Sequence, residues 1–141
     1  MSSRAVLTQN AIERSPADAR RGKGRQLAGT ALTALACLVL AGSAATKFAH
    51  VPRVVQELGR YGFSGGRLIF VACLEAASIV FVLAPPTRRL GLLFVSAYLG
   101  GAIATHLQHG SSMAPPAIVL AIFWIATALA RPEDFSPLLG G

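Results

Sequence analysis

Charged residues are scarce in this chain, and their scarcity excludes an ordinary soluble domain. Asp, Glu, Lys and Arg make up 13% of the 141 residues, whereas 53% of the residues are hydrophobic. Soluble globular domains are about 25% charged. Because a small domain has a large surface for its volume, it cannot hide this much apolar surface from water. The composition therefore predicts an integral membrane protein.

Motifs for conventional catalysis or metal binding are also absent. The sequence has no Ser-His-Asp pattern, phosphate-binding loop, zinc signature or nucleotide-binding motif. Its two cysteines, Cys37 and Cys73, lie in apolar runs without C-x-x-C spacing, as small buried hydrophobes do. His106 and His109 form H-x-x-H, but a metal site needs three or four ligands and no further His or Cys is near. We expect no metal site, and we expect any chemistry to depend on a cofactor or a partner.

Four long apolar runs dominate what is present. In lipid such runs must be helical, because backbone polar groups find no water to bond there. A helix rises about 1.5 Å per residue, so roughly 20 residues cross a hydrocarbon core of about 30 Å. The sequence predicts an all-α four-transmembrane-helix bundle over residues 27–130, with spans at 27–46, 67–84, 90–107 and 114–130.

The basic residues are unevenly distributed, and their distribution predicts the orientation. With the N-terminus in the cytoplasm, nine Lys and Arg residues fall on the cytoplasmic side and four on the outer side. Residues 1–26 are predicted to be a basic, disordered cytoplasmic tail, and residues 131–141 a short second tail. No nucleic-acid-binding pattern accompanies the basic residues, so nucleic acid is not an expected partner. The predicted location is the cell membrane, with several spans and both termini cytoplasmic.

A cleaved signal peptide over residues 1–45 is the alternative to this topology. The small residues of "AGSAAT" would suit cleavage, and removal of the segment would leave three spans. The charged region before the apolar run is, however, unusually long for a signal peptide.

A short amphipathic helix is predicted between the first two spans. Val51, Val54, Val55 and Leu58 follow the i, i+3, i+4, i+7 spacing, and polar or charged residues fill the opposite face. Such a helix lies in the membrane interface. We expect it on the outer side, where it covers the mouth of the bundle or closes over a site.

Ionisable residues inside the spans need a specific explanation. A charged side chain at mid-depth costs about 3 kcal/mol on insertion scales. Glu75 lies about 12 Å below the outer end of its span, and His106 falls in the same outer half of the bundle. Lys47 ends the first span on that side. The candidate polar site consists of Lys47, Glu75, Thr105 and His106.

Two interpretations of this polar site remain open. In one, Glu75 and His106 exchange protons near neutral pH beside a quinone head group or another small polar ligand, with Tyr98 and Trp124 available to stack on its ring. In the other, the polar groups only join helices. Glu75 then bonds His106 or Thr105, and the Lys47 side chain extends to the membrane surface.

Small residues recur every four positions along the third span. Such stripes let neighbouring backbones approach closely, which is how helices pack in lipid. We expect them to bring His106 near a partner helix. The candidate packing residues are Ala97, Gly100, Gly101 and Ala104.

Three segments, taken in order, carry a resemblance to a known family. They are "GSAATKF" at the end of the first span, "ACLEAASIVFVLAPPTRRLG" over the second, and "YLGGAIATHLQHG" in the third. Over residues 27–130 the chain resembles the DoxX-like family of small four-helix bacterial membrane proteins. Ala72 stands where a glycine is common, and the basic tail is longer than usual. The positions that match are Lys47, Glu75, Gly100, Gly101, Thr105 and His106.

The resemblance implies a four-helix bundle in the cytoplasmic membrane and leads to two hypotheses of function. The family takes its name from a thiosulfate:quinone oxidoreductase subunit, so one hypothesis is a redox subunit with quinone as its cofactor. The alternative is a non-enzymatic scaffold that recruits protein partners. A transporter has little support, because no inverted repeat is visible. The expected partners are the lipid bilayer and either a redox protein or a second copy of the chain.

Overall fold

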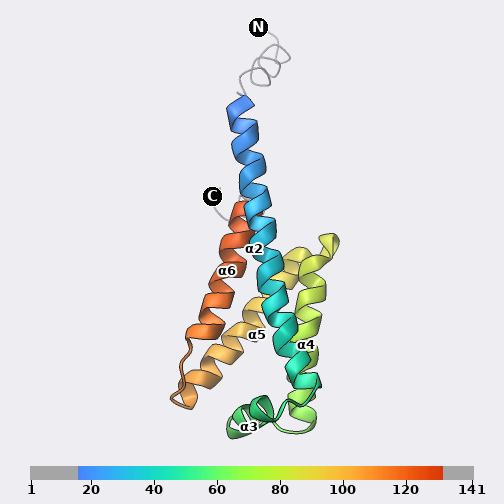
Figure 1. Cartoon of the computed structure of the whole chain (residues 1–141), viewed down its shortest axis with the longest axis vertical. Helices are drawn as coiled ribbons and strands as arrows, with labels where there is room; N and C mark the ends of the chain where they lie inside the picture. Colours follow the sequence, from blue (N-terminus) through green and yellow to red (C-terminus); the bar gives the residue numbers. More distant parts are fainter. Residues whose placement is uncertain (1–15, 132–141) are drawn as a thin grey trace.

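The computed structural model describes residues 16–131, and this part of the chain is helical with no strands (Figure 1). The predicted all-α class is confirmed. The elements are α2 (Pro16–Phe48), α3 (Pro52–Arg60), α4 (Gly66–Leu83), the 3₁₀ turn η1 (Pro85–Thr87), α5 (Arg88–Gln108) and α6 (Ala114–Ala130).

Three stretches of the described residues are long and apolar enough to cross a membrane. They are Arg20–Phe48, Gly66–Leu83 and Pro85–Gln108. The fourth apolar helix, α6, has 17 residues, so at about 1.5 Å per residue it alone falls short of a core of about 30 Å. Several apolar helices thus support a membrane protein, whereas the number of four spans stays a prediction.

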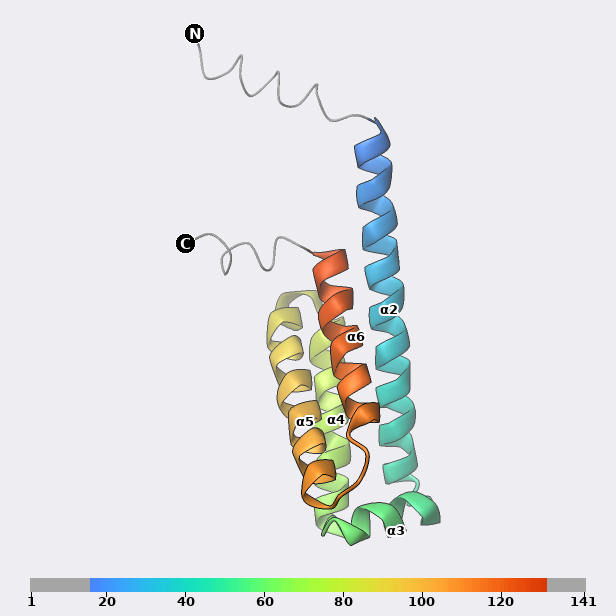
Figure 2. The ribbon, with the colours of Figure 1, turned by 90° about the vertical axis from the view of Figure 1, so that its left-hand side faces the viewer.

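The helices α2, α4, α5 and α6 pack as an antiparallel group (Figures 1 and 2). Small residues bring their backbones together at two places. A Cβ added to Gly29 in α2 would lie 2.6 Å from the carbonyl oxygen of Ala126 in α6, and one added to Gly91 in α5 would overlap the backbone at Val82 in α4. Only glycine fits at these two crossings.

The two glycines that the sequence suggested for close packing have a different environment. A Cβ added to Gly100 or Gly101 would meet nothing within 4 Å among the described residues. Neither glycine therefore brings two helices of the described chain together. The expectation was drawn from spacing alone, which cannot say which face of α5 meets a neighbour.

Burial in the bundle is distributed as a lipid-exposed protein requires. The centre is filled by apolar side chains from four helices, while many large apolar residues point outward; Leu38, Phe70 and Val80 are 70%, 63% and 64% exposed. Exposed apolar surface of this extent marks an interaction with membrane or protein. The central cluster is Ala36, Cys37, Leu40, Val82, Val95, Leu99 and Phe123.

Helix α2 begins well before its predicted apolar span. Residues 1–26 are predicted from the sequence to be a disordered tail, but residues 16–26 belong to the helix; residues 1–15 lie outside the described part. Pro16 suits a first helical position, and the Arg and Lys residues that follow favour helix. Figure 2 shows that this basic end of α2 extends past the end of α6.

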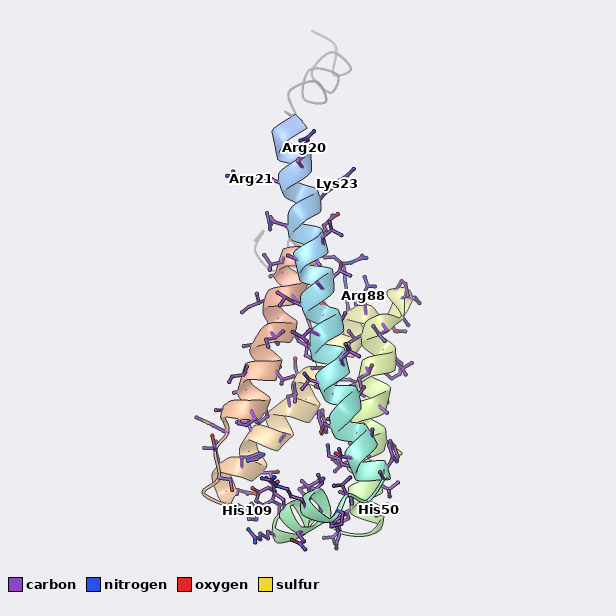
Figure 3. The ribbon with its side chains drawn as sticks, viewed as in Figure 1. Arg20, Arg21, Lys23, His50, Arg88 and His109 are labelled. Atoms are coloured by element: carbon purple, nitrogen blue, oxygen red, sulfur yellow. The ribbon has the colours of Figure 1, made fainter. Side chains whose placement is uncertain are left out.

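Basic side chains are more numerous at one end of the bundle than at the other. Figure 3 shows Arg20, Arg21 and Lys23 on the extended end of α2, and Arg88 at the turn between α4 and α5 on the same side. His50 and His109 lie at the opposite end, beside α3. Arg131 directly follows α6, and residues 132–141 lie outside the described part.

A short helix, α3, lies between α2 and α4, and its place in a membrane interface stays a prediction. It crosses the end of the bundle opposite the basic extension (Figures 1 and 2). Val54 and Leu58 are half-buried, whereas Arg53 and Glu57 are exposed, so its two faces differ as predicted. Gly62 and Gly65 then adopt positive φ values of 82° and 54°, which lets the chain turn back into α4.

Candidate functional site

A buried ion pair joins α2 to α4. Lys47 Nζ lies 2.6 Å from Glu75 Oε2, and the two side chains are 7% and 2% exposed. Lys47 Nζ also donates to Ser43 Oγ at 2.6 Å, and the Tyr98 hydroxyl lies 3.5 Å from it. Two opposite charges and two hydroxyl-bearing side chains therefore form one polar group inside an apolar bundle.

The local sequence explains why these side chains meet. Leu68, Ala72, Glu75, Ser78 and Val82 recur every three or four residues and form the buried stripe of α4, so Glu75 must face the interior. Ser43 is one helical turn before Lys47 on α2, and i, i+4 neighbours share a face. Each charge needs the other, because an unpaired charge in an apolar interior is very unfavourable.

The partners of Glu75 and Lys47 correct one of the two sequence interpretations. That interpretation had Glu75 bonded to His106 or Thr105, and Lys47 extending to the membrane surface. Instead Lys47 is buried against Glu75, while Thr105 Oγ1 donates to the carbonyl of Gly101 in its own helix at 2.9 Å. Lys47 lies in the last turn of α2, and the anion beside it there is Glu75 of α4.

A cavity of about 540 Å³, which we call the Glu75 cavity, opens beside this pair. Lys47, Glu75, Thr105 and His106 all contribute to its wall, so the structure brings the four candidate site residues to one space. Its size is within the range of small-molecule sites, about 300–1,000 Å³. The apolar part of the wall includes Val39, Leu40, Leu58, Phe63, Leu74 and Val119.

On this wall, His106 has a buried side-chain nitrogen, Nδ1, that lacks a hydrogen-bond partner among the described residues. The ring packs edge-on against Tyr61, with the ring centroids 5.4 Å apart. Tyr61 is itself held by its hydroxyl, which donates to Ser111 Oγ at 2.8 Å. A buried polar atom without a partner is rare in proteins and needs an explanation, such as a ligand or water.

Ser43 and Tyr61 contact the candidate site residues without having been predicted from the sequence, and only one of the two predicted stacking residues lines the cavity. Ser43 was not considered, although its position one turn before Lys47 was a usable signal. Tyr61 follows α3 and could not be placed near His106 without the fold. Tyr98 lines the cavity, whereas Trp124 does not: its Nε1 donates to Ser96 Oγ at 3.2 Å, at an exposed position.

The four small residues of α5 that were predicted to pack differ in whether they line the cavity. Ala97 and Gly101 line the Glu75 cavity, whereas Gly100 and Ala104 do not. Cys37 and Cys73 are both free thiols. Within residues 16–131, no three His, Cys, Asp or Glu side chains gather in a way that could hold a metal ion.

Comparison with known proteins gives one match. A family model described as the DoxX-like family matches residues 31–126, which includes the whole ion pair and His106. No curated protein and no solved structure matches the chain.

Proposed function

The chain belongs to the DoxX-like family, and from that premise we propose that it is a multi-pass protein of the cell membrane whose Glu75 cavity binds a quinone head group as part of a redox assembly. In this proposal α2, α4, α5 and α6 cross the membrane and α3 lies in its outer interface. The basic ends of α2 and α6 and the turn at Arg88 face the cytoplasm, following the positive-inside rule.

The observation that carries the proposal is the unpartnered His106 Nδ1 in a cavity that also holds a buried ion pair. A quinone head group is a flat ring with polar oxygens on an apolar body. The cavity offers matching features: polar groups from Lys47, Tyr98 and His106, and aliphatic walls from α2, α4 and α6. The residues present therefore fit such a ligand.

The residues of the cavity have distinct roles in this proposal. A bound quinone supplies redox chemistry that takes up or releases protons with electrons. His106 would bind the ligand through Nδ1, the buried ring nitrogen without a partner among the described residues, and would hold or release a proton at that atom. Lys47 holds Glu75 in place and would supply a cation on the cavity wall beside the ligand. Tyr61 fixes the plane of the His106 ring.

The test is the quinone content of the purified protein. The chain is extracted in mild detergent, its lipids are removed with organic solvent, and quinones are counted by mass spectrometry. We expect near-stoichiometric quinone in the wild type and a loss of about ten-fold or more in His106→Ala, because a bond to a buried group contributes about 1.5 kcal/mol. His109→Ala is the matched control, since His109 is exposed and does not line the cavity. Quinone absent from the wild type, or equal in both variants, contradicts the proposal.

A scaffold function is the second candidate, and the exposed basic extension of α2 favours it. Arg20, Arg21, Lys23 and Arg25 project from a helix that continues beyond the bundle. Such a surface suits an acidic protein partner. Replacing the four residues by Gln should abolish co-purification of that partner and leave quinone content unchanged; unchanged co-purification contradicts the scaffold function.

A further inference from the structure

A second cavity, of about 550 Å³, lies at the opposite end of the bundle from the Glu75 cavity. It is formed where residues 26–34 of α2 meet the C-terminal halves of α4 and α6 and the start of α5. We call it the Arg88 cavity. It is lined by Gln26, Thr30, Thr33, Ala34, Val82, Leu83, Arg88, Leu92, Phe123, Thr127, Ala130 and Arg131.

The charged residues that line this cavity within the described part of the chain are of one sign. Arg88 and Arg131 contribute two guanidinium groups, and none of the lining residues among 16–131 is Asp or Glu. Arg88 Nε donates to the carbonyl of Val82 at 3.2 Å, which holds the half-buried guanidinium at the rim with its terminal nitrogens available. Arginine binds phosphate in a forked geometry, through two parallel hydrogen bonds. The rim therefore has the chemistry of a phosphate site.

The threonine hydroxyls of the wall are already hydrogen-bonded within their own helices. Thr30, Thr33 and Thr127 each donate their hydroxyl to a carbonyl one turn earlier in the same helix, at 2.8–2.9 Å. The polar groups of the wall that remain to bind a ligand are thus the Gln26 amide and the two guanidinium groups, and the guanidinium groups favour an anion.

The rest of the cavity is apolar. Val82, Leu83, Leu92 and Phe123 form a hydrocarbon wall that reaches the buried cluster at Phe123. A free phosphate would leave this wall in contact with nothing but water. A ligand that carries a phosphate at one end and a hydrocarbon chain at the other uses both parts.

We propose that the Arg88 cavity binds an anionic phospholipid, with its phosphate between Arg88 and Arg131 and an acyl chain against Leu92 and Phe123. Basic pockets between membrane helices on the cytoplasmic side are suited to anionic lipid headgroups. Arg20, Arg21 and Lys23, exposed at the same end (Figure 3), raise the local concentration of such lipids. This inference does not depend on the quinone proposal, because it concerns the other end of the bundle.

The test measures the lipid that stays bound after purification. The full chain is reconstituted in nanodiscs of phosphatidylglycerol and phosphatidylcholine, re-extracted into detergent, and analysed by native mass spectrometry. Arg88→Gln/Arg131→Gln is compared with Arg21→Gln/Lys23→Gln, which removes the same charge at the same end but leaves the cavity wall intact. At about 1 kcal/mol per basic residue, we expect the cavity pair to lower bound phosphatidylglycerol at least about ten-fold and the control pair less.

A third variant guards against a folding defect at Arg88. Thr30→Phe adds bulk to the wall at a position exposed on α2 and removes no charge. It should displace the lipid while the thermal unfolding of the protein stays close to that of the wild type. Equal lipid retention in the cavity pair and the control pair would overturn the proposal, and so would retention of neutral phosphatidylcholine to the same degree.

A competition experiment with inorganic phosphate distinguishes a phospholipid headgroup from free phosphate as the bound anion. If the site is for lipid, phosphate added in excess leaves bound phosphatidylglycerol unchanged and does not stabilise the delipidated protein. Stabilisation by phosphate alone that is lost in Arg88→Gln/Arg131→Gln would show a soluble phosphate site and would overturn the lipid proposal.

Discussion

The two cavities of this bundle treat charge in opposite ways. In the Glu75 cavity, cation and anion come from the same chain, and both are buried and hydrogen-bonded. In the Arg88 cavity, the charged lining residues that the structure describes are two arginines, one half-buried and one exposed. A buried charge must be paired within the protein because water cannot reach it. A charge at the rim is hydrated, so it needs no partner from the protein and is accessible to an external anion. The first arrangement suits selective binding of a neutral ring, and the second suits capture of an anion.

The largest effect should come from breaking the buried pair. Glu75→Leu leaves Lys47 buried without its anion, and we expect the free energy of unfolding to fall by about 3–5 kcal/mol. Lys47→Met/Glu75→Leu replaces both charges by apolar groups and should recover most of the loss. Unfolding in mixed detergent, followed by circular dichroism, gives the three values. A single variant as stable as the wild type would contradict a buried pair.

A substitution at a helix crossing should have the next largest effect. Gly91 and Gly101 lie on the same helix, but only Gly91 has the backbone of α4 against it. Gly91→Ala forces the helices apart, and we expect a loss of about 1–3 kcal/mol. Gly101→Ala meets open space and should change stability by less than about 1 kcal/mol, in the stabilising direction, because alanine favours helix. The same unfolding measurement applies; equal losses would contradict the assigned crossing.

High salt should weaken lipid binding at the Arg88 cavity more than it weakens the Lys47–Glu75 pair, and this effect should be smaller than the two above. The Debye length falls from about 10 Å at 0.1 M to about 3 Å at 1 M, and exposed charges are screened far more than buried ones. We expect phosphatidylglycerol retention to drop several-fold at high salt. The coupling of Lys47 and Glu75, measured by a double-mutant cycle that adds the single variant Lys47→Met, should change little. A coupling that vanishes in salt would show that water reaches the pair.

The smallest effect is expected at Tyr98. Its hydroxyl lies 3.5 Å from Lys47 Nζ, a long contact next to the much shorter ones to Ser43 and Glu75. Tyr98→Phe should lower the free energy of unfolding by about 0.5 kcal/mol or less. A loss as large as that of Glu75→Leu would mean that the hydroxyl, not Ser43, completes the site.

The sequence predicted the helices well because their cause is local. Apolar runs of membrane length, the amphipathic spacing of residues 51–58 and the turn glycines are all readable along the chain. The gathering of Lys47, Glu75 and His106 was also accessible, since depth in a span follows from residue number. The pairing within the group was not, because rotation of each helix about its axis is set by packing. The same limit explains why Gly100 and Gly101 were assigned to packing in place of Gly29 and Gly91.

The basic N-terminal part of the chain shows a second limit of prediction from sequence, which is that composition does not give the conformation. Composition marked residues 1–26 as a tail, since charge alone does not distinguish an exposed helix from coil. The Arg88 cavity was missed for a related reason: its wall combines Gln26, Arg88 and Arg131, which belong to three segments far apart in sequence.

The most direct test of the central claim is nitrogen NMR of the histidine side chains with and without added quinone. The chain has three histidines, so ¹⁵N-histidine labelling gives few signals, and His106→Ala assigns the one in the cavity. We predict that a short-chain quinone shifts Nδ1 of His106 and leaves His50 and His109 unchanged. A His106 signal that is unaffected at saturating quinone, in protein whose Lys47–Glu75 pair is intact, would contradict the claim that this cavity binds quinone.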